Sequence, residues 1–326
     1  MSISLLCHVS SIAKRILFWV CLFLAYSTSC YSYEILLGTG DTNTFSFFAG
    51  KRLCHSVNSH TTAVTCRVVS MKDHTASLTN LAGGALDVAL VNAKMIHDAF
   101  NSEGMFRYLD IDYDNLRLLL PLYKEPAVLA VRRDAAISSL DDLAGKRVNG
   151  GPVFTMQNIA FQEIMKIKGW DEDIFNVYQT LSPQHAQDSI AFNAGDIQAM
   201  VHFGMHPDQK LKQELSRGQG KLIGLYDSSV EQLIQSHSGF TSYVLDAGIY
   251  PEQNQKITTV AMETLLITSS DADKDTLLVV LEAILKGKEQ LQRAHPALLE
   301  EGLTVEMLSD RYVAPHPAVE EFFRNH

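Results

Sequence analysis

Short apolar segments alternate with amphipathic segments along most of the chain. Runs rich in β-branched and other apolar residues predict strands at 64–69 and 257–268, and short strands that end the segments 83–92 and 193–202. Apolar residues at helical spacing predict helices at 45–57, 75–81, 155–168 and 272–286. This alternation predicts an α/β fold in which crossover helices join parallel strands.

A glycine-punctuated turn joins the first strand, at 34–37, to the first helix. Gly38 and Gly40 permit backbone angles that a side chain would forbid. Three residues suited to cap the helix follow, namely Thr42, Asn43 and Thr44. Free backbone N–H groups and the positive end of the helix dipole favour a carboxylate or a phosphate at such a turn. An ordinary strand-to-helix turn is the alternative.

Two strands end after similar patterns of glycine, aspartate and apolar residues. One pattern, 83–92, ends at Asn92, and the other, 193–202, ends at His202. We interpret them as one design used once in each lobe, with chance similarity as the alternative. Ligands of open α/β sheets bind outside the carboxyl ends of the strands. Asn92 and His202 are therefore candidate ligand contacts.

The N-terminal segment has the pattern of a secretory signal peptide. Lys14 and Arg15 precede an apolar run at 16–26, and small residues follow at 27–30. The run is too short to span a bilayer comfortably, so we expect cleavage after residues 1–30 and export to the periplasm. An uncleaved anchor and a lipid-modified Cys30 are the alternatives.

Two of the five cysteines, Cys54 and Cys66, lie beyond the expected cleavage site. Export favours a disulfide bond between them. Cys54 belongs to the first predicted helix and Cys66 to the next strand, two elements that we expect to pack together. Two buried free thiols are the alternative.

The length of 326 residues and the hydrophobic content of 46% allow a large core, which we expect to be divided between two lobes. The net charge of −10 argues against a nucleic-acid partner, because no basic stripe is present to neutralise phosphates. The apolar segment at 115–133 is interrupted by Pro121 and Pro126, and its length suits a crossing between lobes. We expect hinges at 121–132 and 240–260, with lobe 1 at 31–132 and 256–326 and lobe 2 at 133–255.

The sequence lacks a nucleophile elbow, a Walker loop, a metalloprotease helix and a cysteine-pair zinc site. His202 and His206 are four residues apart, but Gly204 and Pro207 argue against a helix that presents both to a metal. The acidic loop at 110–114 lacks the glycine and the late glutamate of a calcium loop. We therefore expect no metal, no cofactor and no enzyme activity.

Several short motifs follow one another along residues 34–326. They are Ile35-Leu36-Leu37-Gly38-Thr39-Gly40, Cys54 with Cys66, 84–91, 139–148, Gly204-Met205-His206-Pro207 and 315–323. In this order they resemble the TAXI-type periplasmic solute receptors of tripartite TRAP transporters. The segment 139–148 alone is general to solute-binding proteins, whereas the order of all the motifs is specific.

The resemblance implies a periplasmic binding protein fold of type II, with two lobes, each a sheet flanked by helices, and a ligand cleft between them. It implies a receptor that closes on a small anionic solute and delivers it to a TRAP-type membrane permease. It also implies that the cysteine pair is bridged, and we expect a monomer. Two departures are that Asp41 enters the first loop and that Phe47 and Phe48 replace the usual paired tyrosines. The second loop, 153–156, lacks the usual Ser-Gly-Thr-like turn.

We expect a glutamate-like amino acid as the ligand, with L-glutamate the first to test. Lys94, just past Asn92, is placed to reach a second carboxylate. Asp41 would repel an anion unless the ligand also carries an ammonium group; the alternative is that Asp41 points to solvent as a turn residue. The candidate ligand contacts are Thr39, Gly40, Asp41, Thr42, Asn43, Thr44, Phe45, Asn92, Lys94, Thr155, Met156, Gln157, His202, Phe203 and Gly204.

Three other functions remain open. A periplasmic sensor that docks on a membrane signalling protein would have the same sequence features as an import receptor. A receptor for an ATP-driven importer would share the fold, although the C-terminal motif disfavours it. A periplasmic enzyme with this fold would need a catalytic set that the sequence does not provide.

Overall fold

Strands and helices alternate over the part of the chain that the computed structural model describes, namely residues 33–182, 186–216, 219–236, 239–300, 302–304 and 313–326. The strands are β1 (Tyr33–Thr39), β2 (Val64–Ser70), β3 (Val88–Asn92), β4 (Leu116–Arg132), β5 (Arg147–Asn149), β6 (Val177–Gln179), β7 (Ala199–Phe203), β8 (Gly220–Gly224), β9 (Phe240–Leu245) and β10 (Ile257–Ser269). The helices are α2 (Phe45–His60), α3 (His74–Ala82), α4 (Ala93–Phe100), α5 (Met156–Ile167), α6 (Gln187–Ala194), α7 (Gln209–Ser216), α8 (Ser228–Gln235), α9 (Lys274–Lys286), α10 (Lys288–Ala294) and α11 (Pro317–Asn325). The signal peptide expected at 1–30, with Cys30, lies outside the described residues.

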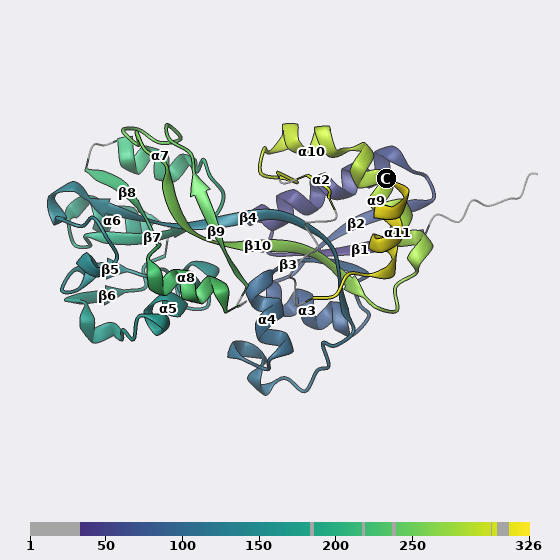
Figure 1. Cartoon of the computed structure of the whole chain (residues 1–326), viewed down its shortest axis with the longest axis horizontal. Helices are drawn as coiled ribbons and strands as arrows, with labels where there is room; N and C mark the ends of the chain where they lie inside the picture. The colour runs from purple at the N-terminus through teal and green to yellow at the C-terminus, as the bar shows by residue number, and fades with distance from the viewer. Residues whose placement is uncertain (1–32, 183–185, 217–218, 237–238, 301, 305–312) are drawn as a thin grey trace, which may run out of the picture. The chain divides into compact units, whose positions relative to one another are not determined.

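The described strands form one ten-stranded sheet (Figure 1). Its order is β2-β1-β3-β10-β4-β7-β5-β6, while β8 pairs with β4 and β9 pairs with β10. β1 is parallel to β3, and β5 is parallel to β6 and β7. β4 and β10 pair antiparallel with each other and with β7 and β3 respectively. The expected parallel pairing therefore holds within each half of the sheet, and two long antiparallel strands connect the halves.

β4 is one continuous strand that includes both Pro121 and Pro126. Its register against β10 shifts where Tyr123 faces Thr264 but Pro121 faces the next residue of β10. Leu122 is therefore the extra residue of a bulge. A bulge relieves the ladder of the hydrogen bond that Pro121 cannot donate, so the strand passes the proline without ending.

Successive residues of β3 and β10 face different cores. Leu90 and Leu266 lie in the cluster that α2 and α9 cover, whereas Val91 and Leu265 lie in the cluster that α3 and α4 cover. In the other half, a cluster covered by α5 and α8 lies on one face and a cluster containing Phe192 of α6 lies on the other. Each half of the sheet is thus covered by helices on both faces, as expected.

The predicted helix starts follow from side-chain caps. The hydroxyl oxygen of Thr44 accepts a hydrogen bond from the Phe47 N–H at 3.3 Å, and that of Thr155 accepts one from the Asn158 N–H at 3.3 Å. The short helical turn that we expected Ser139 to cap, Asp141–Leu143, is different. There the Asp142 carboxylate accepts hydrogen bonds from the backbone of Ser138 and Ser139.

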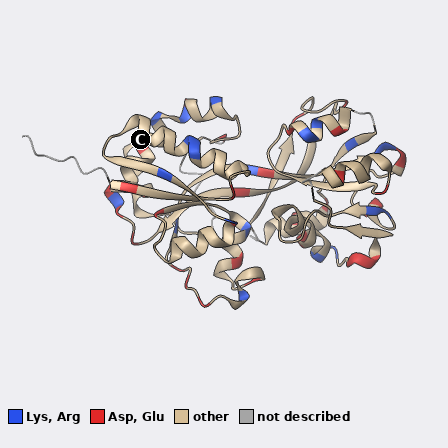
Figure 2. Ribbon diagram, turned by 180° about the vertical axis from the view of Figure 1, so that it is seen from behind, with Lys and Arg blue, Asp and Glu red and all other residues tan. Residues whose placement is uncertain are grey.

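The predicted disulfide is confirmed: Cys54 in α2 is bonded to Cys66 in β2. This bond, between two buried residues, contradicts the alternative of two buried free thiols. None of the helices in the described part of the chain is long and apolar enough to cross a membrane. Figure 2 shows Lys and Arg interspersed with Asp and Glu along the described ribbon.

Candidate functional site

The first loop follows the carboxyl end of β1 and leads into α2. Thr39 is buried, and its hydroxyl donates to the Gly40 carbonyl at 3.1 Å. The Gly40 N–H in turn donates to the hydroxyl of Ser46, in the first turn of α2, at 3.2 Å. Thr44 closes the loop because its hydroxyl donates to the Asp41 carbonyl at 2.6 Å. The loop is therefore held by its own hydrogen bonds at the N-terminus of α2, with Phe45 as the first helical residue.

Asp41 stabilises this loop as a turn residue. Its carboxylate is exposed and accepts hydrogen bonds from the Asn43 N–H at 3.1 Å and the Thr42 hydroxyl at 3.4 Å. This is the arrangement of an aspartate that bonds the backbone two residues on. This arrangement is the one expected under the alternative in which Asp41 points to solvent as a turn residue.

A row of polar side chains crosses the sheet beside the first loop. Asn92 of β3 lies directly opposite Thr264 of β10, which lies directly opposite Tyr123 of β4. All three residues are buried. Directly paired residues of neighbouring strands present their side chains on the same face of a sheet. The Tyr123 ring meets the Phe45 ring edge to face at 4.9 Å, which places the row beneath the start of α2.

Two atoms of this row lack hydrogen-bond partners among the described residues. Asn92 caps α4 because its Oδ1 accepts from the Lys94 N–H at 3.0 Å, whereas its Nδ2 is buried and unpaired. The Tyr123 hydroxyl is buried and makes no hydrogen bond of acceptable geometry, although the hydroxyls of Ser46 and Thr264 lie near enough to counteract part of the effect of burial on its pKa. A buried polar group without a partner costs on the order of 1–3 kcal/mol. Such atoms in a native protein point to a ligand or to water.

Glu125 extends the row by two residues along β4. It is only partly buried, and its Oε2 accepts a hydrogen bond from the Thr264 hydroxyl at 3.1 Å. Burial raises the pKa of Glu125 to about 7, and the hydrogen bond from Thr264 opposes the rise. Burial and the charge of Glu125 also raise the pKa of Tyr123. The row thus contains an acid that changes charge near neutral pH.

Lys94 is engaged by two carboxylates. Its ammonium binds Asp98 one turn further along α4 and lies 3.5 Å from Glu163 of α5. The Lys94 side chain is buried, with 4% of its surface exposed. The Lys94 ammonium therefore lies between α4 and α5, where two carboxylates neutralise it, rather than at the carboxyl end of β3.

Three of the predicted contacts lie at the start of α5. Thr155 caps the helix, and Gln157 Nε2 donates to the Val201 carbonyl of β7 at 2.6 Å. Met156 packs against the core that α5 and α8 cover and also against the core that α3 and α4 cover. This end of α5 consequently contacts both halves of the sheet.

The remaining predicted contacts lie at the end of β7 and just after it. Phe203 packs into the core beneath α5, and His202 lies with its ring 5.4 Å from that of His206. The Nδ1 of His206 is hydrogen-bonded to the Tyr250 hydroxyl, and the Nε2 atoms of His202 and His206 are buried without a partner. Burial, and then the charge of His202, lowers the pKa of His206 to about 3. Burial also lowers the pKa of His202, so desolvation favours the neutral form of both rings. Gly204 follows with φ of 148°, which favours glycine.

In the described part of the chain, one group of three residues with metal-ligating atoms lies within 4.8 Å, namely His97, Asp98 and Glu103. Asp98 already binds the Lys94 ammonium, a cation that opposes a metal ion at the same carboxylate.

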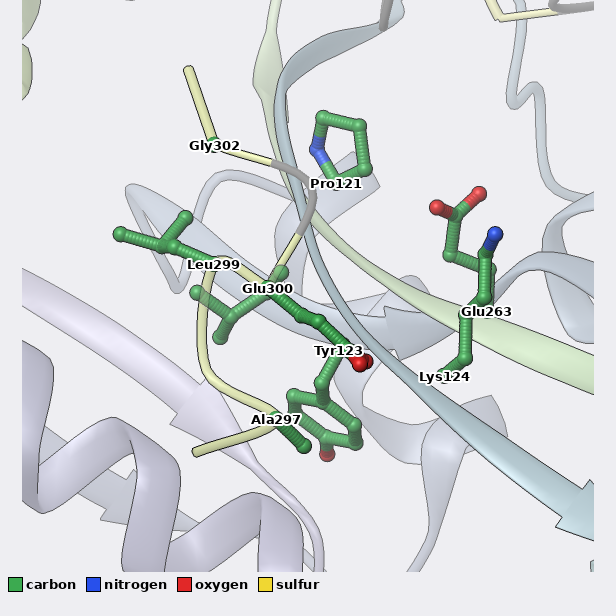
Figure 3. A pocket seen from close by; sticks show the side chains of 9 residues that line it. Pro121, Tyr123, Lys124, Glu263, Ala297, Leu299, Glu300 and Gly302 are labelled. Carbon is green, nitrogen blue, oxygen red and sulfur yellow. The ribbon is translucent and has the colours of Figure 1, made fainter. Parts of the chain in front are cut away.

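Three hollows in the described part of the chain are lined by residues other than the predicted contacts. A cavity of about 20 Å³ lies against β4 between Tyr123 and Ala297 (Figure 3). That volume holds one water. Figure 3 shows the Tyr123 ring directed toward Ala297, with Lys124 and Glu263 on the other side of β4. Two open hollows of about 640 and 740 Å³ are lined by other residues, near Tyr226 and near Ile190.

The structure brings together the first loop and Asn92, but it adds three residues that the sequence reasoning missed: Tyr123, Glu125 and Thr264. A signal for two of them was present. Tyr123 and Glu125 are polar residues spaced by two inside the apolar segment 115–133, which places both on one face of a strand. Polar side chains on a buried strand face need hydrogen-bond partners, and a ligand can provide them.

Comparison with known proteins places the chain in context. The sequence profile of the NMT1-like family matches residues 37–326. The chain is similar to a TctC solute-binding protein from Polaromonas, at 15% identity over 83% of this chain and 88% of that chain, with a TM-score of 0.54. It is similar to XAC2383 from Xanthomonas citri, solved bound to ATP, at 9% identity over 90% and 95% of the two chains, with a TM-score of 0.51.

The periplasmic aliphatic sulphonate binding protein SsuA from Escherichia coli is also similar, at 13% identity over 90% of this chain and 79% of that chain, with a TM-score of 0.50. At these identities the likeness establishes the fold alone. The expected two-lobe fold of periplasmic binding proteins is thereby confirmed.

Proposed function

The chain belongs to the NMT1-like family, and we propose that it is an extracytoplasmic receptor that binds a small anionic solute and delivers it to a TRAP-type membrane permease. The observation that carries this proposal is the buried row of Asn92, Thr264 and Tyr123 beneath the N-terminus of α2. Unpaired donors beside a helix N-terminus are complementary to a carboxylate. The TAXI subtype, the periplasmic location and the absence of enzyme activity are parts of the same proposal.

The proposed lobes follow the two halves of the sheet. Lobe 1, at 31–132 and 256–326, contributes the first loop and Asn92, while lobe 2, at 133–255, contributes the start of α5 and the end of β7. We place the solute between these strand ends, because ligands of such sheets bind there. The proposed contacts from lobe 2 are Thr155, Met156, Gln157, His202, Phe203 and Gly204.

We propose a glutamate-like amino acid as the solute and a monomer as the working form. Native mass spectrometry of the purified mature protein tests the function directly, since a receptor is expected to retain a small molecule of defined mass. Titration calorimetry with L-glutamate then measures its affinity. A protein that binds no small organic anion would contradict the receptor assignment. Genes for a TRAP-type permease beside this gene would support that partner over an ATP-driven importer or a signalling protein.

A further inference from the structure

We propose that Glu125, rather than Asp41, receives the ammonium group of the solute, and that the site therefore selects zwitterionic α-amino acids over keto acids of the same skeleton. This inference rests on the proposed receptor function and adds to it the residue that distinguishes the two classes of solute.

Glu125 is an acceptor without a cation. Its hydrogen-bond partner is the neutral hydroxyl of Thr264, at 3.1 Å, and the described residues provide no basic side chain that pairs with it. A carboxylate shielded from water without a cation costs free energy in the empty protein. An ammonium group of the solute would supply the missing charge and up to three hydrogen-bond donors.

The donors of the row lie next to this acceptor. Asn92 Oδ1 is used to cap α4, so the amide must present its Nδ2 donor to the row. The Tyr123 hydroxyl is a second unpaired donor, and Tyr123 is two residues from Glu125 on the same face of β4. One acceptor beside two donors is the complement of an ammonium group beside a carboxylate, which is the head group of an α-amino acid.

Accessibility separates the two carboxylates that could bind an ammonium group. Asp41 is exposed and bonded within its own turn, so water screens its charge. Glu125 is partly buried beside Thr264 and near Tyr123, where charges are screened less. A pairing at Glu125 therefore discriminates more strongly between solutes with and without the ammonium group.

The test compares L-glutamate and 2-oxoglutarate, which share a carbon skeleton and differ at the amino position. Titration calorimetry is done at pH 8 on wild type, on Glu125→Gln and on the matched control Asp41→Asn. We expect Glu125→Gln to lose L-glutamate affinity by about tenfold or more, as for a lost charged hydrogen bond. Its affinity for 2-oxoglutarate should be unchanged or higher. Asp41→Asn should change L-glutamate affinity by less than about threefold.

Thermal unfolding without ligand shows whether the affinity loss reflects misfolding. Because Glu125 lacks a cation, Glu125→Gln should unfold at the same temperature as wild type or higher, whereas a structural role would lower it. Wild-type binding of L-glutamate that Glu125→Gln leaves intact would overturn the role of Glu125 but not the receptor function. Tight wild-type binding of 2-oxoglutarate alone would overturn the amino-acid selectivity, again leaving the receptor intact. If wild type binds no organic anion, either by native mass spectrometry or by calorimetry, both proposals would be overturned.

Discussion

At the scale of single residues, burial shifts two titratable groups of the site in opposite directions toward their neutral forms. It raises the pKa of Glu125 to about 7 and lowers the pKa of His206 to about 3. Desolvation disfavours the charged form of either group. The uncharged His206 can therefore act only as a hydrogen-bonding group at physiological pH, whereas Glu125 is divided between two charge states. Of the two groups, Glu125 is therefore the one that should make the stability of the ligand-free protein depend on pH near neutrality.

The first prediction concerns the stability of the ligand-free protein between pH 4.5 and 8. The folded pKa of Glu125, about 7, lies above its unfolded value, so the folded state holds the proton more tightly. Both states are protonated below pH 4.5, and the folded state then loses stability relative to the unfolded state as pH rises to about 7. Glu125→Gln should remove this loss, on the order of 2 kcal/mol. Chemical denaturation of both proteins at pH 5 and pH 8 measures it, and a difference that does not change with pH would contradict the shift.

At the scale of elements, the disulfide holds α2 to β2. The first loop joins β1 to the N-terminus of α2, so the position of the proposed anion site depends on how α2 packs. Cys54 and Cys66 are separated by 12 residues. Closing a loop of this length constrains the unfolded chain and stabilises the folded state by about 3 kcal/mol.

The second prediction follows from this bond. The double substitution of Cys54 and Cys66 by alanine should lower the free energy of unfolding by about 3 kcal/mol, measured by denaturant titration. Adding a reductant should lower the stability of wild type similarly and leave the double variant unchanged. A wild-type protein with two thiols that react with an alkylating agent under non-reducing, denaturing conditions would refute the bond.

The elements also show which features a sequence can reveal. Thr44 and Thr155 were predictable as helix caps because a cap depends on residues within three positions. The row of Asn92, Thr264 and Tyr123 was not, because it needs the register of three strands far apart in the sequence. Asn92 was nevertheless expected from its place at a strand end. The engagement of Lys94 by Glu163 likewise depends on the packing of α4 against α5, which no local pattern specifies.

At the scale of the whole molecule, β4 and β10 connect the two halves of the sheet, which supports our placing of the hinges there. The lobes that we propose are joined in the structure by contacts besides these strands. Lys94 of α4 lies 3.5 Å from Glu163 of α5, and Met205, after β7, packs against the core beneath α2 and α9. These contacts would have to break for the proposed lobes to open, so they favour the closed arrangement.

The last prediction is that the Lys94–Glu163 ion pair favours closure of the proposed lobes. Glu163→Gln removes the charge across the two helices while Lys94 keeps its bond to Asp98, so we expect the fold to persist. The ligand-free variant should have a larger radius of gyration by small-angle scattering than ligand-free wild type, and saturating L-glutamate should bring the two values together. Glu282→Gln, which removes an exposed pair within α9, is the matched control and should scatter as wild type does. Equal radii for the Glu163 variant and wild type, with and without L-glutamate, would mean that this ion pair does not control opening. Because a ligand shifts an equilibrium only by its differential affinity for the two states, the same variant should also bind L-glutamate more weakly if closure contributes to affinity.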